Sequence, residues 1–159
     1  MGIEASYQYL GDRKNIYTLN TSYIDEQLER DGSVAMENAA SPNGNLQRFD
    51  LSASYFRDQT WGLSAAVFDI SGDRDTTLYA PEADAGSRKG SADTTGLTLQ
   101  ADWTPFGKES SWRAPWANVR VGLEYTMYDK INGASSNYDG FGRDASDNNT
   151  LFVVVWTAF

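Results

Sequence analysis

The 159-residue chain contains neither cysteine nor histidine. Without cysteine there is no disulfide framework and no thiolate metal site. Without histidine the chain lacks the commonest general base, the commonest transition-metal ligand and the usual haem ligand. These two absences count against an enzyme, so we expect no catalytic residue, no metal site and no bound cofactor.

Long apolar runs and an excess of basic residues are also missing. No stretch of about 18 apolar residues occurs, which is the length that a transmembrane helix needs. The mean hydropathy of −0.53 is still compatible with membrane strands, because their residues alternate between apolar and polar. The net charge of −9 disfavours nucleic acid as a partner.

The chain does have a strong period of two. Apolar and polar residues alternate in seven segments of about the length that a tilted membrane strand needs, roughly 9–11 residues. The last segment ends the chain on an aromatic residue, Phe159. The seven segments cover residues 3–9, 17–23, 48–55, 61–67, 97–103, 119–127 and 151–159.

The connections between these segments are short at one end and long at the other. Two tight turns and one medium link are expected at 11–14, 57–60 and 105–117. Long loops rich in Gly, Ser, Asn and Asp are expected at 26–45, 71–94 and 129–149. This asymmetry is typical of outer-membrane barrels. We therefore expect a single all-β domain over residues 1–159, an antiparallel up-and-down transmembrane β-barrel in the bacterial outer membrane.

Aromatic residues mark both ends of the apolar faces. Amphipathic rings prefer the two boundaries between lipid and water. The expected membrane girdle consists of Tyr9, Tyr17, Tyr23, Phe49, Tyr55, Trp61, Trp103, Tyr125 and Phe159.

The opposite face of the segments is polar and is expected to line the barrel lumen. Its charges suit either a cation-selective pore or a salt-bridge lattice that fills a narrow barrel. Many strands would favour the pore and eight strands the lattice, because lumen diameter grows with strand number. The charged residues expected there are Glu4, Arg48, Asp50, Asp102, Arg120 and Glu124.

The last segment departs from this pattern, since its lumen face is apolar. It carries Phe152, Val154 and Trp156 where the other segments are polar. Such an apolar lumen patch could pack against a plug or a partner, but the favoured interpretation is that Trp156 fills space over a small neighbour such as Gly122.

Two stretches, 71–75 and 137–149, are rich in Asp and Asn. Clustered carboxylate and amide oxygens can bind Ca²⁺, but neither stretch has the spacing of an EF-hand loop. Asp and Asn are also ordinary turn residues, and turn chemistry is the favoured interpretation.

Seven strands are an odd number, whereas bacterial single-chain barrels have an even one. An open sheet edge in lipid is very costly. We therefore expect the C-terminal part of a larger barrel, with a complete eight-stranded barrel as the alternative. The first residues show no signal-peptide pattern, so an exported protein would need an N-terminal part before Met1. A soluble β-sandwich or barrel with its apolar face inward also fits the alternation.

Three stretches carry a family resemblance: QADWTPFGKE at 100–109, APWAN at 114–118 and NGASSNYDGFGRDASDNNTL at 132–151. They resemble the C-terminal region of large proteobacterial outer-membrane proteins labelled as cytochrome c or cytochrome-associated porins. The resemblance implies the end of a larger barrel that accompanies haem proteins in electron transfer. The chain has no Cys-x-x-Cys-His motif, so it cannot attach c-type haem and no family residue is carried over.

The expected function is therefore a passive pore or conduit wall, which sheathes an electron-transfer partner if the resemblance holds. Expected partners are the outer-membrane bilayer, the barrel-insertion machinery through Phe159 and a haem protein. Two alternatives stay open: a small barrel whose long loops mediate binding or adhesion, and a soluble β-protein.

Overall fold

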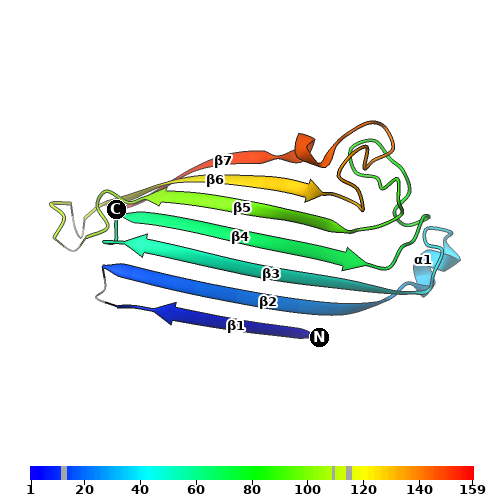
Figure 1. Ribbon diagram of the computed structural model, residues 1–159, viewed down its shortest axis with the longest axis horizontal. Helices are drawn as coiled ribbons and strands as arrows, with labels where there is room; N and C mark the ends of the chain where they lie inside the picture. The colour runs from blue at the N-terminus through cyan, green and yellow to red at the C-terminus, as the bar shows by residue number, and fades with distance from the viewer. Residues whose placement is uncertain (12–13, 109, 114–115) are drawn as a thin grey trace.

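The computed structural model describes residues 1–11, 14–108, 110–113 and 116–159, which form one antiparallel sheet of seven strands (Figure 1). Neighbours in the sheet are neighbours in sequence, so the chain runs up and down without a crossover. The strands are β1 (Gly2–Tyr9), β2 (Asn15–Glu29), β3 (Asn43–Arg57), β4 (Trp61–Gly72), β5 (Thr94–Trp103), β6 (Asn118–Lys130) and β7 (Thr150–Ala158). The predicted all-β antiparallel order is confirmed. The sheet is open, with β1 and β7 at its two edges.

The β2–β3 hairpin is longer than the sequence predicts. Its ladder continues as far as the pair Glu29 and Asn43, so the predicted loop 26–45 shrinks to residues 30–42. That loop contains a one-turn helix, α1 (Asp31–Ala35), and the loop before β7 contains a 3₁₀ turn, Ala145–Asn148. Neither was predicted, because elements this short have no readable helical period. No helix in the described ranges is long and apolar enough to cross a membrane.

The register keeps the two faces of the sheet separate. Tyr7 pairs with Leu19, and further along the same row Ala65 pairs with Leu99. Directly paired residues share a face, so the apolar positions of all seven strands coincide on one side. The pairing shifts once, between Thr95 and Gly96.

Within the described ranges no second layer covers the apolar face. The buried apolar residues of the described chain are Ala39, Ala134, Tyr138 and Ala145, and all four lie in loops. The apolar strand residues are open instead: Leu63 is 58% exposed. The described chain therefore leaves the hydrophobic side of the sheet exposed.

The connections sort as expected, with long loops at one end of the sheet and short links at the other (Figure 1). The β3–β4 turn is of type I′, since Asp58 and Gln59 both have φ of 56° and the Thr60 N–H donates to the Arg57 carbonyl at 3.0 Å. The predicted turn 11–14 includes residues 12 and 13, which lie outside the described ranges.

Candidate functional site

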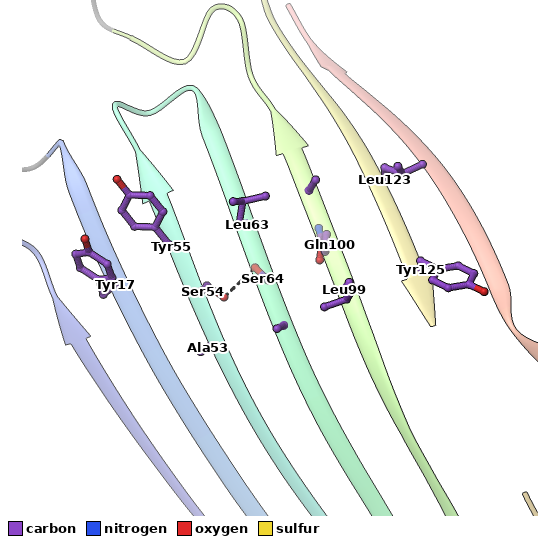
Figure 2. Close-up of a pocket in the computed structure, with 12 residues that line it drawn as sticks. Tyr17, Ala53, Ser54, Tyr55, Leu63, Ser64, Leu99, Gln100, Leu123 and Tyr125 are labelled. Carbon is purple, nitrogen blue, oxygen red and sulfur yellow. Dashed lines mark hydrogen bonds between the residues drawn. The ribbon is translucent and has the colours of Figure 1, made fainter. Parts of the chain in front are cut away.

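Polar side chains form ladders of hydrogen bonds across the polar face of the sheet. The Ser6 hydroxyl donates to Asn20 Oδ1 at 2.6 Å, and Asn20 Nδ2 donates to Ser52 Oγ at 3.4 Å. Further along the sheet the hydroxyls of Ser64 and Ser54 lie 2.9 Å apart, as the dashed line in Figure 2 shows. These bonds connect four adjacent strands into one hydrophilic wall.

One charged pair lies toward the long-loop end of this wall. The Arg48 guanidinium binds the Asp50 carboxylate in a bidentate manner, with Nε to Oδ2 at 2.7 Å and Nη2 to Oδ1 at 2.8 Å. Ser22 of the neighbouring strand adds a bond to Asp50 at 3.4 Å. The two charges are neutralised on the same strand.

A second charged pair lies at the short-turn end. Asp102 is only 5% exposed, and its Oδ1 accepts a hydrogen bond from Arg120 Nε at 2.9 Å. Its Oδ2 accepts one from Gln100 Nε2 at 3.0 Å. With Val154 and Trp156 these three side chains line a cavity of about 410 Å³.

Gly122 makes room for Asp102 rather than for Trp156. A Cβ at Gly122 would lie 2.8 Å from Asp102 Oδ1, whereas β7 presents Val154 opposite it. Trp156 pairs with Arg120 instead. The expectation that Trp156 fills the space over Gly122 is wrong, because the pairing register places the two residues in different rows.

The remaining two predicted lumen charges, Glu4 and Glu124, make no ion pair within the described part of the chain. Glu4 pairs with Ser22 across the sheet, and Glu124 lies between Gln100 and Phe152. Of the six predicted charges, the structure joins four into two separate pairs. The two that remain without an ion pair in the described residues are both carboxylates.

The polar face also carries aromatic residues that the sequence analysis did not single out. Phe68 packs over Gly96, where a Cβ would lie 2.5 Å from the ring, and it meets Tyr128 edge-on at 5.8 Å. Phe56 packs over Gly62 in the same way. The available signal was a glycine within each neighbouring strand, which often marks a close approach.

The predicted girdle residues form two stacks at the short-turn end of the apolar face. The Tyr17 ring lies 6.3 Å from Tyr9 and 4.8 Å from Tyr55, and the rings of Trp61 and Trp103 stack at 6.1 Å. These two stacks join five of the nine predicted residues.

The other four girdle residues lie apart from those stacks. Tyr23 pairs with Phe49 near the long-loop end. Tyr125 pairs with Leu151 in the row of Tyr7 and Leu99, and Phe159 follows the end of β7 and is fully exposed.

A hollow of about 540 Å³ opens in the middle of the apolar face (Figure 2). Small side chains such as Ala53, Ala65 and Ala101 give it depth, and the rings of Tyr17 and Tyr55 stand at one side. The surface is therefore uneven as well as apolar.

Asp75 ties the first long loop to the second. Its carboxylate accepts the N–H groups of Ala40 at 3.0 Å, Thr77 at 3.0 Å and Leu78 at 3.0 Å, and Arg30 Nη1 lies 3.6 Å away. Both charged side chains are buried. The pKa of Asp75 is lowered to about 2, and the hydrogen bond from the Leu78 N–H is the largest cause. Burial of the carboxylate acts in the opposite direction and raises the pKa. The buried Asp75 carboxylate therefore links the first long loop, through Arg30 and Ala40, to its own loop.

Tyr138 ties the second loop to the third. The ring is 1% exposed, and its hydroxyl donates to the Asp84 carbonyl at 2.8 Å. Arg143 forms an ion pair with the Asp84 carboxylate, and Ser87 Oγ donates to the Asn132 carbonyl at 2.7 Å. The three long loops, residues 30–42, 73–93 and 131–149, therefore form one packed unit, which we call the loop body.

The Asp side chains of the two Asp-rich stretches accept backbone N–H groups, Asp139 within its own turn and Asp73 from the neighbouring strand β3. Asp139 Oδ1 accepts the N–H groups of Phe141 at 2.8 Å and Gly142 at 3.1 Å. Asp73 accepts the Asn45 N–H at 2.9 Å. Within the described ranges no group of three acidic residues is arranged to hold a metal ion.

No family model, curated protein or solved structure matches the chain. The resemblance to cytochrome-associated porins therefore stays a prediction.

Proposed function

We propose that the chain forms part of the wall of an outer-membrane β-barrel and acts as a passive pore or conduit wall. The observation that carries this proposal is an apolar face spanning seven strands that nothing in the described chain covers, backed by a hydrogen-bonded polar face.

The exposed apolar area is too continuous for an ordinary soluble surface. Leu19, Leu99 and Val153 are 48%, 42% and 68% exposed, and they lie on the same side of the sheet. Soluble monomers rarely expose apolar patches beyond a few hundred Å². A soluble sandwich would bury this face under a second layer, so the uncovered face favours lipid.

The height of the apolar face suits a membrane. From Arg57 to Phe49 the strand advances eight residues, or about 27 Å at roughly 3.4 Å per residue. A strand tilt of about 40° reduces this to roughly 21 Å, close to the apolar band of outer-membrane barrels, which is about 25 Å.

The proposal requires further strands to close the barrel. The free edges of β1 and β7 carry backbone groups that have no partner in lipid, and each such group costs several kcal/mol. In a seven-stranded meander these two strands run in the same direction. An odd number of additional strands would pair with both edges in antiparallel fashion.

The polar wall suits small cations better than anions, because Glu4 and Glu124 are not neutralised by ion pairs within the described residues. The family resemblance adds a haem protein as a candidate for the enclosed partner. Conductance of the inserted protein in a planar bilayer tests the pore, and a protein that inserts without conducting would leave only the role of conduit wall.

The membrane assignment predicts opposite outcomes for two adjacent substitutions. Leu99→Arg places a charge on the apolar face, where it costs about 2–4 kcal/mol near the middle of the bilayer. Gln100→Arg places the same charge on the polar face. In vesicle insertion measured by protease protection, we expect Leu99→Arg to fail and Gln100→Arg to insert like the unmodified chain. Equal insertion of both variants would contradict the proposal.

The loop body supports a second candidate function, the binding of a partner or surface by the long loops. Its interior is packed around Asp75 and Tyr138, while Met36 and Phe141 are 72% and 69% exposed on its outside. If this function holds, Phe141→Ser should weaken adhesion to the target surface and leave insertion unchanged. Unchanged adhesion would remove Phe141 from the candidate surface.

A further inference from the structure

All tryptophans of the chain lie at the short-turn end of the sheet. Antiparallel pairing brings the start of β4, the end of β5 and the end of β7 to this same end. Residues 104–117 link β5 to β6, and the described parts of this link extend beyond that end of the sheet (Figure 1). We call this link the tryptophan connector. The five tryptophans are Trp61, Trp103, Trp112, Trp116 and Trp156.

The first part of the tryptophan connector is docked on the β3–β4 turn. The Thr104 N–H donates to the Thr60 carbonyl at 2.7 Å. A Cβ at Gly107 would lie only 1.9 Å from the Gln59 carbonyl oxygen, so the connector and the turn are in close contact. Lys108 Nζ forms an ion pair with the Asp58 carboxylate, and this hydrogen bond is the largest cause that lowers the pKa of Asp58.

The second part of the tryptophan connector presents rings and a cation to its surroundings. Trp112 and Trp116 are 74% and 80% exposed. The Arg113 guanidinium carbon lies 3.8 Å from the centroid of the Trp112 ring, and Phe106 meets that ring edge-on at 5.9 Å. The backbone N–H of Trp116 donates to the Arg113 carbonyl at 2.8 Å. Two large rings are thus held outward beside a positive charge.

The charge of this end is opposite in sign to that of the whole chain. The three links 10–14, 57–60 and 104–117 contain five Lys or Arg and three Asp or Glu, whereas the chain as a whole has a net charge of −9. Tryptophan prefers the headgroup layer of a bilayer, and Lys and Arg are attracted to anionic lipid.

We propose that the tryptophan connector is a membrane-surface anchor, with Trp112 and Trp116 among the headgroups and Arg113 on the phosphates of anionic phospholipids. The anchor rests on the proposed function, because it requires the adjacent apolar face to lie in the same bilayer. It adds a specific lipid class to that function. Arginine is well suited to this role, since its fork of donors matches phosphate oxygens.

Two single-tryptophan proteins test the anchor, and the absence of other reporters makes the signal unambiguous. One retains Trp112 and the other retains Trp61, with every other tryptophan replaced by phenylalanine. Each is inserted into vesicles of phosphatidylcholine, with and without phosphatidylglycerol, that contain brominated lipid. Quenching by bromine reports contact with lipid, and quenching by iodide reports contact with water.

With phosphatidylglycerol present, we expect brominated lipid to quench Trp112 and iodide to lose access to it. Arg113→Gln should lower the ratio of membrane-bound to unbound tryptophan connector about fivefold, which is the effect of one basic residue near an anionic surface. The matched control is Arg74→Gln, which removes the same charge from an exposed position at the long-loop end and should change nothing.

Three other results would overturn the anchor, and they differ in what else they overturn. If lipid quenches Trp61 while iodide still reaches Trp112, the anchor fails and the barrel wall stands. If Trp112 is quenched equally in both vesicle types and in Arg113→Gln, binding to anionic headgroups is wrong. If lipid does not quench Trp61 either, the proposed function fails together with the anchor.

Discussion

At the scale of single residues, the most heavily used side chain is Asp75, whose carboxylate collects backbone N–H groups from two loops. Its pKa is lowered from 3.8 to about 2, chiefly by the Leu78 N–H. The folded protein therefore holds this proton less tightly than the unfolded chain does. The resulting stabilisation is complete above about pH 4 and is lost as the pH falls through about 2.

Asp75→Asn should loosen the loop body at neutral pH. The asparagine amide oxygen is a weaker acceptor than the Asp75 carboxylate, and the amide carries no charge to face Arg30. We expect the amides of Ala40 and Leu78 to exchange hydrogen about tenfold faster, with little change in the strands. Asp73→Asn is the control, because Asp73 accepts a single N–H, that of Asn45. Equal protection of Ala40 in both variants would argue against the anchoring role of Asp75.

A second residue-scale prediction concerns the β3–β4 turn. Gln59 has φ of 56°, a conformation that costs a residue with a Cβ about 1 kcal/mol or more and glycine almost nothing. Gln59→Gly should raise the midpoint of thermal unfolding in detergent by about 2–4 °C. Gln59→Ala keeps the Cβ and should give no gain. A lower midpoint for the glycine variant would show that the turn is not strained.

The sequence predicted the place of this turn but not its type. Type I′ turns usually carry Asn-Gly or Asp-Gly, and Asp58-Gln59 gives no such signal. The choice was made by the flanking strands, whose twist favours this turn. Likewise, Asp102 could be predicted as a charge on the polar face, but its contact with Gly122 depends on a register that only pairing determines.

At the scale of elements, the strands were predictable because alternation is strong and the connections differ in length. The extension of β2 and β3 beyond Ile24 and Arg48 was not, because the added residues do not alternate clearly and are held by the backbone ladder. Helix α1 is one turn long and is fixed by the loop body around it. Tertiary contacts, rather than local pattern, therefore decide the ends of these elements.

The contact between β5 and β6 gives a prediction at this scale. Gly122→Ala would place a Cβ 2.8 Å from Asp102 Oδ1 and so displace the carboxylate from Arg120. We expect a loss of about 1–3 kcal/mol in unfolding free energy, from a buried hydrogen bond to a charged group. Thermal unfolding in detergent measures it.

Gly2→Ala is the matched control for that experiment. Gly2 is also a strand glycine, but a Cβ there would meet its nearest atoms at 3.9 Å, an ordinary contact. If Gly122→Ala were no less stable than Gly2→Ala, the Asp102–Arg120 pair would not contribute to the sheet.

At the scale of the whole molecule, the structure separates two kinds of packing. The strands leave their apolar side chains exposed, whereas the loops bury Tyr138, Asp75 and Arg30. Sequence composition could not predict that the loops pack against one another in an ordered structure, because Gly, Ser, Asn and Asp are equally frequent in mobile loops. The two faces could be predicted, since a period of two assigns each residue to one side.

The central claim is that the apolar face meets lipid and the polar face meets water. Ala65 and Ala66 are adjacent residues of the same type on opposite faces of β4, paired with Leu99 and Thr98 respectively. Because the chain has no cysteine, Ala65→Cys and Ala66→Cys each provide one labelling site. A nitroxide on each is read in vesicles by its collisions with oxygen, which concentrates in lipid, and with a water-soluble nickel chelate. We predict that oxygen dominates at position 65 and the nickel chelate at position 66; nickel access at position 65 equal to that at 66 would contradict the account.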